Sequence, residues 1–226
     1  MAVLTPDIAK TELAIIELTN AFRAEQKLAP VQANPALTAA ARAFAKFLAS
    51  SDLFSHTADG RQPSDRVKAA GYTYCRTAEN LALNLDSRGF VTAQLARDAV
   101  EGWKNSPGHR KNLVAPHVTE IGVGIAKSKT EEKYLSVQLF GRPMSLQYSF
   151  KIINKVGVPV RYRTGGEQQS VGVRGIVTHT ACDPDEITFD PAVALRFPTR
   201  DGDIFTLQPA PGGSVRVDVQ TKSRAP

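Results

Sequence analysis

Apolar residues recur at helical spacing in the first part of the chain. A helix is expected from Pro6 to Lys27, because four apolar residues fall on one face at separations of seven, three and four: Ile8, Ile15, Leu18 and Phe22. The same kind of spacing predicts a second helix opening at Asn34–Pro35 and a third long one from Phe90 to Ser106, with a short helix from Pro63 to Ala70 between them. The Pro107–Gly108 pair is expected to end the third long helix in a turn.

Alternation of apolar and polar residues marks the strands of this first part. Glu120–Lys127 and Tyr134–Phe140 alternate like two half-buried strands joined by a polar turn, and part of Tyr72–Asn84 has the composition of a third. The expected architecture is therefore a small, largely antiparallel sheet flanked by helices.

The pattern changes after Gly141-Arg142-Pro143. From Tyr148 onward no helical period is present, and short β-type runs are separated by Gly-Gly, Asp-Pro, Asp-Gly and Pro-Gly-Gly turns. The runs are Tyr148–Ile153, Val158–Tyr162, Ser170–Thr178, Glu186–Phe189, Ile204–Leu207 and Val215–Val219. The sequence thus predicts an α+β protein with two domains, 1–145 and 146–226, the second a small all-β sandwich or barrel.

Composition narrows the class of protein. Hydrophobic residues are 42% and charged residues 22% of 226, which is ordinary for a soluble globular chain, and no apolar run is long enough for a membrane helix. The net charge is +6, but acidic residues are interspersed among the basic ones, and the longest basic cluster is only His109-Arg110-Lys111. Nucleic acid is therefore not an expected partner, and the oligomeric state is left open.

The N-terminus and the cysteines bear on the compartment. Met1 to Lys10 lacks the basic and then apolar profile of a signal peptide, so the chain is either cytoplasmic or a mature form whose leader has been removed. Cys75 and Cys182 are the only cysteines and form either a disulfide or two free thiols. A disulfide implies an oxidising compartment. A reactive pair of Cys182 with His179 is a further alternative.

Candidate chemistry lies in the first domain. Three histidines stand there, His56, His109 and His117, together with Glu79 in an otherwise apolar segment and Glu120 at the start of a strand. Two histidines and a glutamate suit zinc with an open position, and they also suit general acid–base chemistry with Glu79 or Glu120 as base. Spacing alone does not bring them together. The plainer alternatives are a structural role for His109 at a helix end and, for Glu79, a buried carboxylate that accepts hydrogen bonds.

Six motifs in order nevertheless resemble one family. The chain is similar to the CAP superfamily of cysteine-rich secretory, antigen 5 and pathogenesis-related proteins, in its bacterial SCP form, over residues 8–142. The motifs are Leu18–Arg23, Asn34–Leu37, Ser55-His56-Thr57, Ala78–Leu81, Trp103–Leu113 and Thr119–Gly124. The resemblance implies an α/β/α sandwich with a central cleft, found outside the cytoplasm.

The resemblance also implies a tetrad of two histidines and two acids that binds zinc or another divalent ion in some members. By position the histidines are His56 and His117 and the first acid is Glu79, whereas Ser106 stands where the second acid is expected. His109 or Glu120 is available to fill that vacancy, and the loss of an anionic group is expected to weaken a metal site.

Three functions follow as hypotheses. The leading one is a secreted or periplasmic CAP protein whose His/Glu cleft binds a divalent cation or small ligand without turnover. The second is a zinc-dependent hydrolase of peptidase type. The third is a lipid- or cell-envelope-binding module in which the β domain docks.

Overall fold

The computed structural model describes residues 3–51, 53–190 and 196–222. The chain divides into two compact units, Met1–Ser145, here the first unit, and Leu146–Pro226, here the β unit. In the described part of the chain no helix is long and apolar enough to cross a membrane. The α+β class predicted from the sequence is confirmed.

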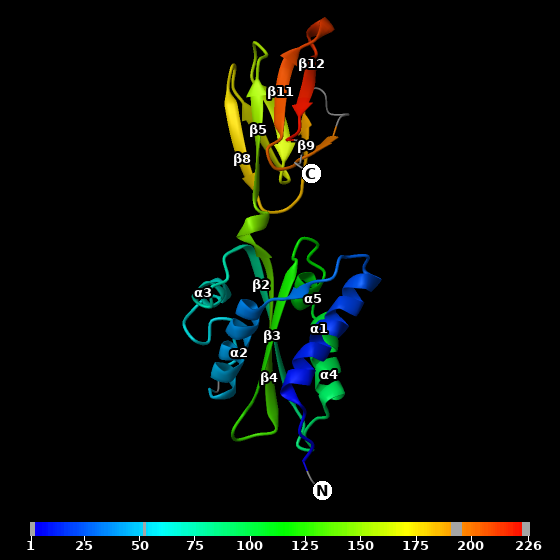
Figure 1. The fold of residues 1–226 in the computed structure, drawn as a ribbon, viewed down its shortest axis with the longest axis vertical. Coiled ribbons are helices and arrows are strands. Elements are labelled where there is room, and N and C mark those ends of the chain that lie inside the picture. The colour runs from blue at the N-terminus through cyan, green and yellow to red at the C-terminus, as the bar shows by residue number, and fades with distance from the viewer. Residues whose placement is uncertain (1–2, 52, 191–195, 223–226) are drawn as a thin grey trace. The chain divides into compact units, whose positions relative to one another are not determined.

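The first unit is a four-stranded sheet with helices on both faces (Figure 1). The sheet order is β1-β3-β4-β2, in which β1 is parallel to β3 and the other pairs are antiparallel. The strands are β1 (Gln32–Ala33), β2 (Tyr74–Leu85), β3 (Glu120–Lys127) and β4 (Lys133–Pro143). The helices are α1 (Ile8–Glu25), α2 (Pro35–Ala49), α3 (Pro63–Ala69), α4 (Thr92–Asn105) and α5 (Pro107–Leu113).

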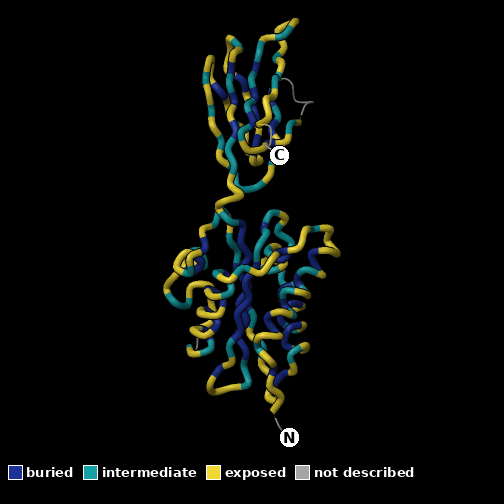
Figure 2. Tube along the Cα trace, viewed as in Figure 1, coloured by how far each residue is buried: buried dark blue, intermediate teal, exposed yellow. Residues whose placement is uncertain are grey.

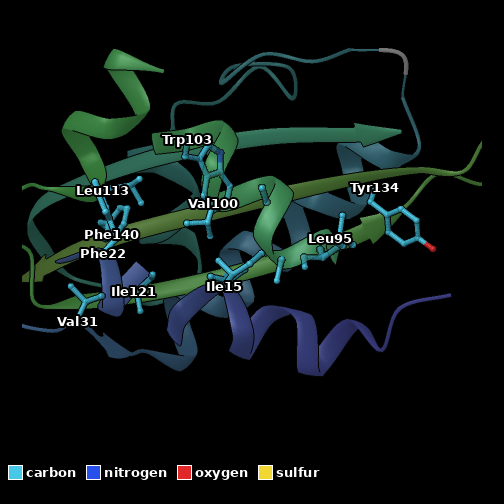
Figure 3. Packing of buried hydrophobic residues seen from close by; sticks show 14 of the residues in the cluster. Ile15, Phe22, Val31, Leu95, Val100, Trp103, Leu113, Ile121, Tyr134 and Phe140 are labelled. Atoms are coloured by element: carbon cyan, nitrogen blue, oxygen red, sulfur yellow. The ribbon is translucent and has the colours of Figure 1, made fainter. Parts of the chain in front are cut away.

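Each face of the sheet has its own apolar cluster. Helices α1 and α4 pack on one face through residues such as Ile15, Leu95 and Trp103 (Figure 3), and α2 and α3 cover the other through Leu37, Phe44 and Val67. The middle strands β3 and β4 are buried almost along their length, as Figure 2 shows. The strand β2 is left at an edge of the sheet.

One expectation about the helices is wrong. The Pro107–Gly108 pair ends α4, as expected, but it also begins the seven-residue helix α5 rather than a turn. Proline is well suited to the first position of a helix, since the N–H that it lacks has no partner there. His109 therefore lies on a short helix that packs against β2 and α4.

The β unit consists of two four-stranded sheets, in orders β10-β9-β6-β7 and β12-β11-β5-β8. Its strands are β5 (Tyr148–Asn154), β6 (Val160–Thr164), β7 (Glu167–Val171), β8 (Ile176–Ala181), β9 (Glu186–Phe189), β10 (Arg196–Pro198), β11 (Ile204–Pro209) and β12 (Val215–Gln220). The core between them includes Phe150, Phe189 and Phe205. The single strand expected over Ser170–Thr178 is wrong, because Gly172 and Gly175 form a turn between β7 and β8.

Cys75 and Cys182 are both disulfide-bonded, and no cysteine is free in the described residues. The free-thiol alternative is therefore wrong. So is the reactive pair of Cys182 with His179, whose Nε2 instead lies 2.8 Å from the hydroxyl of Tyr162.

Candidate functional site

A buried carboxylate lies at the centre of the candidate site. Glu79 is on the edge strand β2, and its side chain is 1% exposed. Arg66 of α3 donates from Nη2 to both carboxylate oxygens, at 3.0 and 2.8 Å. The Arg66 guanidinium also lies 3.5 Å above the ring of Phe44 and donates from Nη1 to Asp59 at 2.8 Å. The partner that a buried carboxylate requires is thus an equally buried arginine.

His56 is joined to this pair. It lies in the segment between α2 and α3, its side chain is 49% exposed, and its Nδ1 is 2.8 Å from Oε1 of Glu79. Because a carboxylate only accepts, Nδ1 of His56 carries the hydrogen in this contact. In the neutral ring that leaves Nε2 with a free lone pair. A histidine held in this way is a base or a metal ligand in a fixed orientation.

His109 reaches the same site from α5. Asn112 of this helix donates to the carbonyl of Glu79 at 3.1 Å and to Oδ1 of Asn80 at 2.8 Å, while Asn80 donates to the carbonyl of His109 at 3.3 Å. These bonds hold α5 against β2 beside Glu79. Burial, and then the nearby charge of His56, lower the pKa of His109 below its ordinary value.

The other two predicted residues have different neighbours. Glu120 accepts from the hydroxyl of Tyr72 at 2.6 Å and from Nδ2 of Asn34 at 3.0 Å, and burial together with the Glu120 hydrogen bond raises the pKa of Tyr72. His117 accepts a bond from Arg142 at its backbone carbonyl, and within the described residues no contact joins its ring to His56 or Glu79. The predicted metal pair of His56 and His117 stays a prediction.

The sequence reasoning missed Arg66 and Asp59. Arg66 lies in a short helix whose polar residues have ordinary spacing. The one sequence signal for a buried cation was Glu79 itself, because a carboxylate in an apolar segment requires a partner. Among the residues that the structure describes, no three or more of His, Cys, Asp and Glu gather in a way that could hold a metal ion. Any metal bound here would thus have few protein ligands.

The lowered pKa of His109 predicts a pH effect on stability. Because its pKa is lower in the folded chain than the unfolded value of about 6.5, the unfolded state binds more protons, and stability should fall as the pH drops through about 6.5. Chemical denaturation at pH 7.5 and 5.5 tests this. His109→Gln should lose less stability over that interval than the wild type, and an equal loss would contradict the prediction. His179→Gln should reduce the loss in the same way, since burial also lowers the pKa of His179 in the β unit.

Comparison with known proteins places the similarity in the first unit. A family model described as CAP, cysteine-rich secretory protein family, matches residues 16–140. Protein YkwD of Bacillus subtilis (strain 168), described as uncharacterized, is 35% identical over 122 residues, which are 54% of this chain and 44% of that protein. This chain therefore spans less than half the length of YkwD.

Two solved structures have a similar fold. An extracellular protein containing an SCP domain from Bacillus anthracis is 26% identical with a TM-score of 0.50, over 63% of this chain and 45% of that one. An outer surface protein from Borrelia burgdorferi is 22% identical with a TM-score of 0.52, over 59% of this chain and 92% of that one. The second of these likenesses shows the fold alone.

Proposed function

The chain belongs to the CAP family, the cysteine-rich secretory proteins, and we propose that it works outside the cytoplasm as a binding protein whose cleft holds a divalent cation. The cation ligands are His56 and His109, and no turnover is proposed. An extracellular SCP-domain protein is among the structures that it resembles, which supports the location. A small polar ligand in the same cleft is the alternative occupant.

The observation that carries this proposal is the contact of His56 with Glu79, 2.8 Å from Nδ1 to Oε1. Histidines that bind metals commonly donate their other ring N–H to a carboxylate, which fixes the ring and makes the free nitrogen more basic. Glu79 supplies that carboxylate and is itself fixed by Arg66. The free Nε2 of His56 is then available to a metal ion that supplies Lewis acidity in the cleft.

His109 supports the same proposal through its charge state. A metal ligand must be the neutral imidazole, and the lowered pKa of His109 keeps it neutral at pH 7. Glu79 is not assigned as a direct ligand, since Arg66 donates to both of its oxygens. With two imidazoles and water as ligands, we expect weaker binding than at structural zinc sites, which use four protein ligands.

Zinc titration tests the proposal. Isothermal titration of the full chain with ZnCl₂ at pH 7.5 should give one site, and His56→Gln and His109→Gln should each weaken it at least about tenfold, the loss typical even of residues that only support a metal ligand. His117→Gln is the matched control and should bind like the wild type. Loss of binding in His117→Gln with full binding in His109→Gln would refute the assignment. Glucose or acetate, titrated at the same concentration, is a further control. Neither should give a heat of binding if the heats measured with ZnCl₂ are specific to the metal.

Hydrolysis is a second candidate, favoured by the same contact. A carboxylate that holds a histidine with one nitrogen exposed is also the arrangement of a general base, with Glu79 in the orienting position. Ester and peptide substrates assayed with and without a chelator separate the two functions. Turnover by the wild type that disappears in His56→Gln would favour the hydrolase. No turnover by the wild type, either with or without the chelator, would favour a binding protein.

A further inference from the structure

Three loops meet at one end of the β unit. Strands β5 and β11 are parallel neighbours, so the loops that follow them, 155–159 and 210–214, lie at the same end. Strand β8 is antiparallel to β5, and the loop that precedes it, 172–175, therefore lies there as well. These loops form the upper tip of the β unit in Figure 1.

A buried asparagine locks two of these loops together. Asn154 is 1% exposed, and its Nδ2 donates to the carbonyl of Val158 at 2.9 Å and to that of Gly172 at 2.9 Å. Its Oδ1 accepts from the backbone N–H of Val156 at 2.8 Å. A buried amide with its hydrogen-bonding groups satisfied in this way gives a rigid arrangement. The loop side chains are therefore presented in a fixed constellation.

Aliphatic side chains are exposed on this end. Ile176 is 65% exposed, Val158 58% and Val173 48%, although each belongs to or adjoins a rigid loop. Arg174, between Val173 and Gly175, has a φ of 54°. A positive φ is uncommon for arginine, and such strain persists where the surrounding structure imposes it and often marks functional sites.

The charge on this end has one sign. Lys155 and Arg174 are exposed, and within the described residues neither has an ion-pair partner. The three loops contain no aspartate or glutamate. Asp190, which follows β9, and Asp218, inside β12, are each ion-paired with an arginine. Unbalanced positive charge thus surrounds the exposed aliphatic side chains.

We propose that this end, the basic apolar tip, docks on the surface of an anionic lipid bilayer. The tip consists of Lys155, Val158, Val173, Arg174 and Ile176. Cations near an anionic membrane surface are attracted to its headgroups, and small aliphatic side chains can enter the interface beside them. A soluble polyanion would use the cations alone, whereas a bilayer uses both kinds of side chain. The proposal concerns the β unit and is independent of the cation cleft.

Vesicle sedimentation of the full chain tests this. The wild type should sediment with vesicles of equal phosphatidylglycerol and phosphatidylcholine and not with phosphatidylcholine alone. The double variant Lys155→Gln/Arg174→Asn should bind about 25-fold more weakly, from roughly fivefold for each cation lost. Asparagine is chosen at position 174 because it tolerates a positive φ. Val158→Ser/Ile176→Ser should also weaken binding, and its effect should persist in high salt.

The controls carry the same changes elsewhere. Lys151→Gln/Arg163→Gln removes two exposed cations outside the tip, and Leu13→Ser removes an aliphatic side chain that is 59% exposed on α1. Both should bind within about twofold of the wild type, the spread expected from the small screened contribution of a distant surface charge. Failure of the wild type to sediment with anionic vesicles overturns the proposal. Loss with the cation variant but none with Val158→Ser/Ile176→Ser also overturns it, since the tip would then bind polyanions in general.

Discussion

Replacing Arg66 by methionine is expected to lower the free energy of unfolding by about 3–5 kcal/mol, the range for breaking a buried ion pair. The side chains of Arg66, Glu79 and Asp59 are only 4%, 1% and 7% exposed. The change therefore leaves Glu79 buried without its arginine, and it leaves Asp59 with only the exposed Arg61. Methionine keeps most of the side-chain volume above the ring of Phe44. The loss of free energy of unfolding therefore reports mainly the buried carboxylate that is left without its cation. Denaturation by guanidinium chloride, followed by the fluorescence of Trp103, measures it.

Arg61→Met is the matched control for this prediction. Arg61 also pairs with Asp59, but its side chain is 57% exposed. An exposed pair contributes about 0–1 kcal/mol, and the control should lose no more than that. If Arg66→Met cost as little as Arg61→Met, Arg66 would not be the cation that supports Glu79.

Gly124→Ala is expected to cost about 3 kcal/mol, the upper end of the usual range for overpacking a core. Strand β3 packs so closely on α2 that a Cβ at this position would lie 2.1 Å from the backbone N of Arg42 and 2.3 Å from the carbonyl carbon of Ala41. Backbone atoms cannot move aside as a flexible side chain can, so α2 would have to shift away from the sheet. Thermal unfolding monitored by circular dichroism measures the loss.

Gly102→Ala serves as the opposite control. Gly102 is exposed in α4, three residues before the last residue of that helix, and a Cβ there would meet no atom within 4 Å. Alanine in a helix interior is better than glycine by about 0.5–1 kcal/mol, so this variant should be slightly more stable. Equal melting temperatures for Gly124→Ala and Gly102→Ala would show that α2 and β3 are not in close contact.

Periodicity was sufficient to predict the main elements. The apolar face of Ile15 and Phe22 predicts α1, and the alternation from Glu120 to Lys127 predicts β3 with its limits. Both signals are local. The expectation that Glu120–Lys127 and Tyr134–Phe140 are half-buried is wrong, however, because helices cover both faces of the sheet and β3 and β4 are buried almost along their length. The loss of helical spacing after Pro143 is also a local signal. The two compact units divide close to it, between Ser145 and Leu146.

Other features depend on contacts that periodicity does not encode. The helix α5 is too short for an apolar period, and it is positioned by hydrogen bonds from Asn112 to β2, more than 30 residues away in the sequence. Family position favours His117, whereas His109 lies on α5, which hydrogen bonds hold against β2 beside Glu79. Of the candidate residues, His56 and Glu79 are joined in the structure, and the buried Arg66 that supports them has no sequence signal of its own.

The most direct test of the cation cleft is anomalous diffraction from crystals of the full chain soaked in zinc. We predict an anomalous peak about 2.0–2.1 Å from Nε2 of His56, the usual zinc–nitrogen distance, with a ring nitrogen of His109 as second ligand and Glu79 still bonded to Nδ1 of His56. A peak at His117 or Glu120, or none in the cleft at a zinc concentration that saturates the titration, would contradict it.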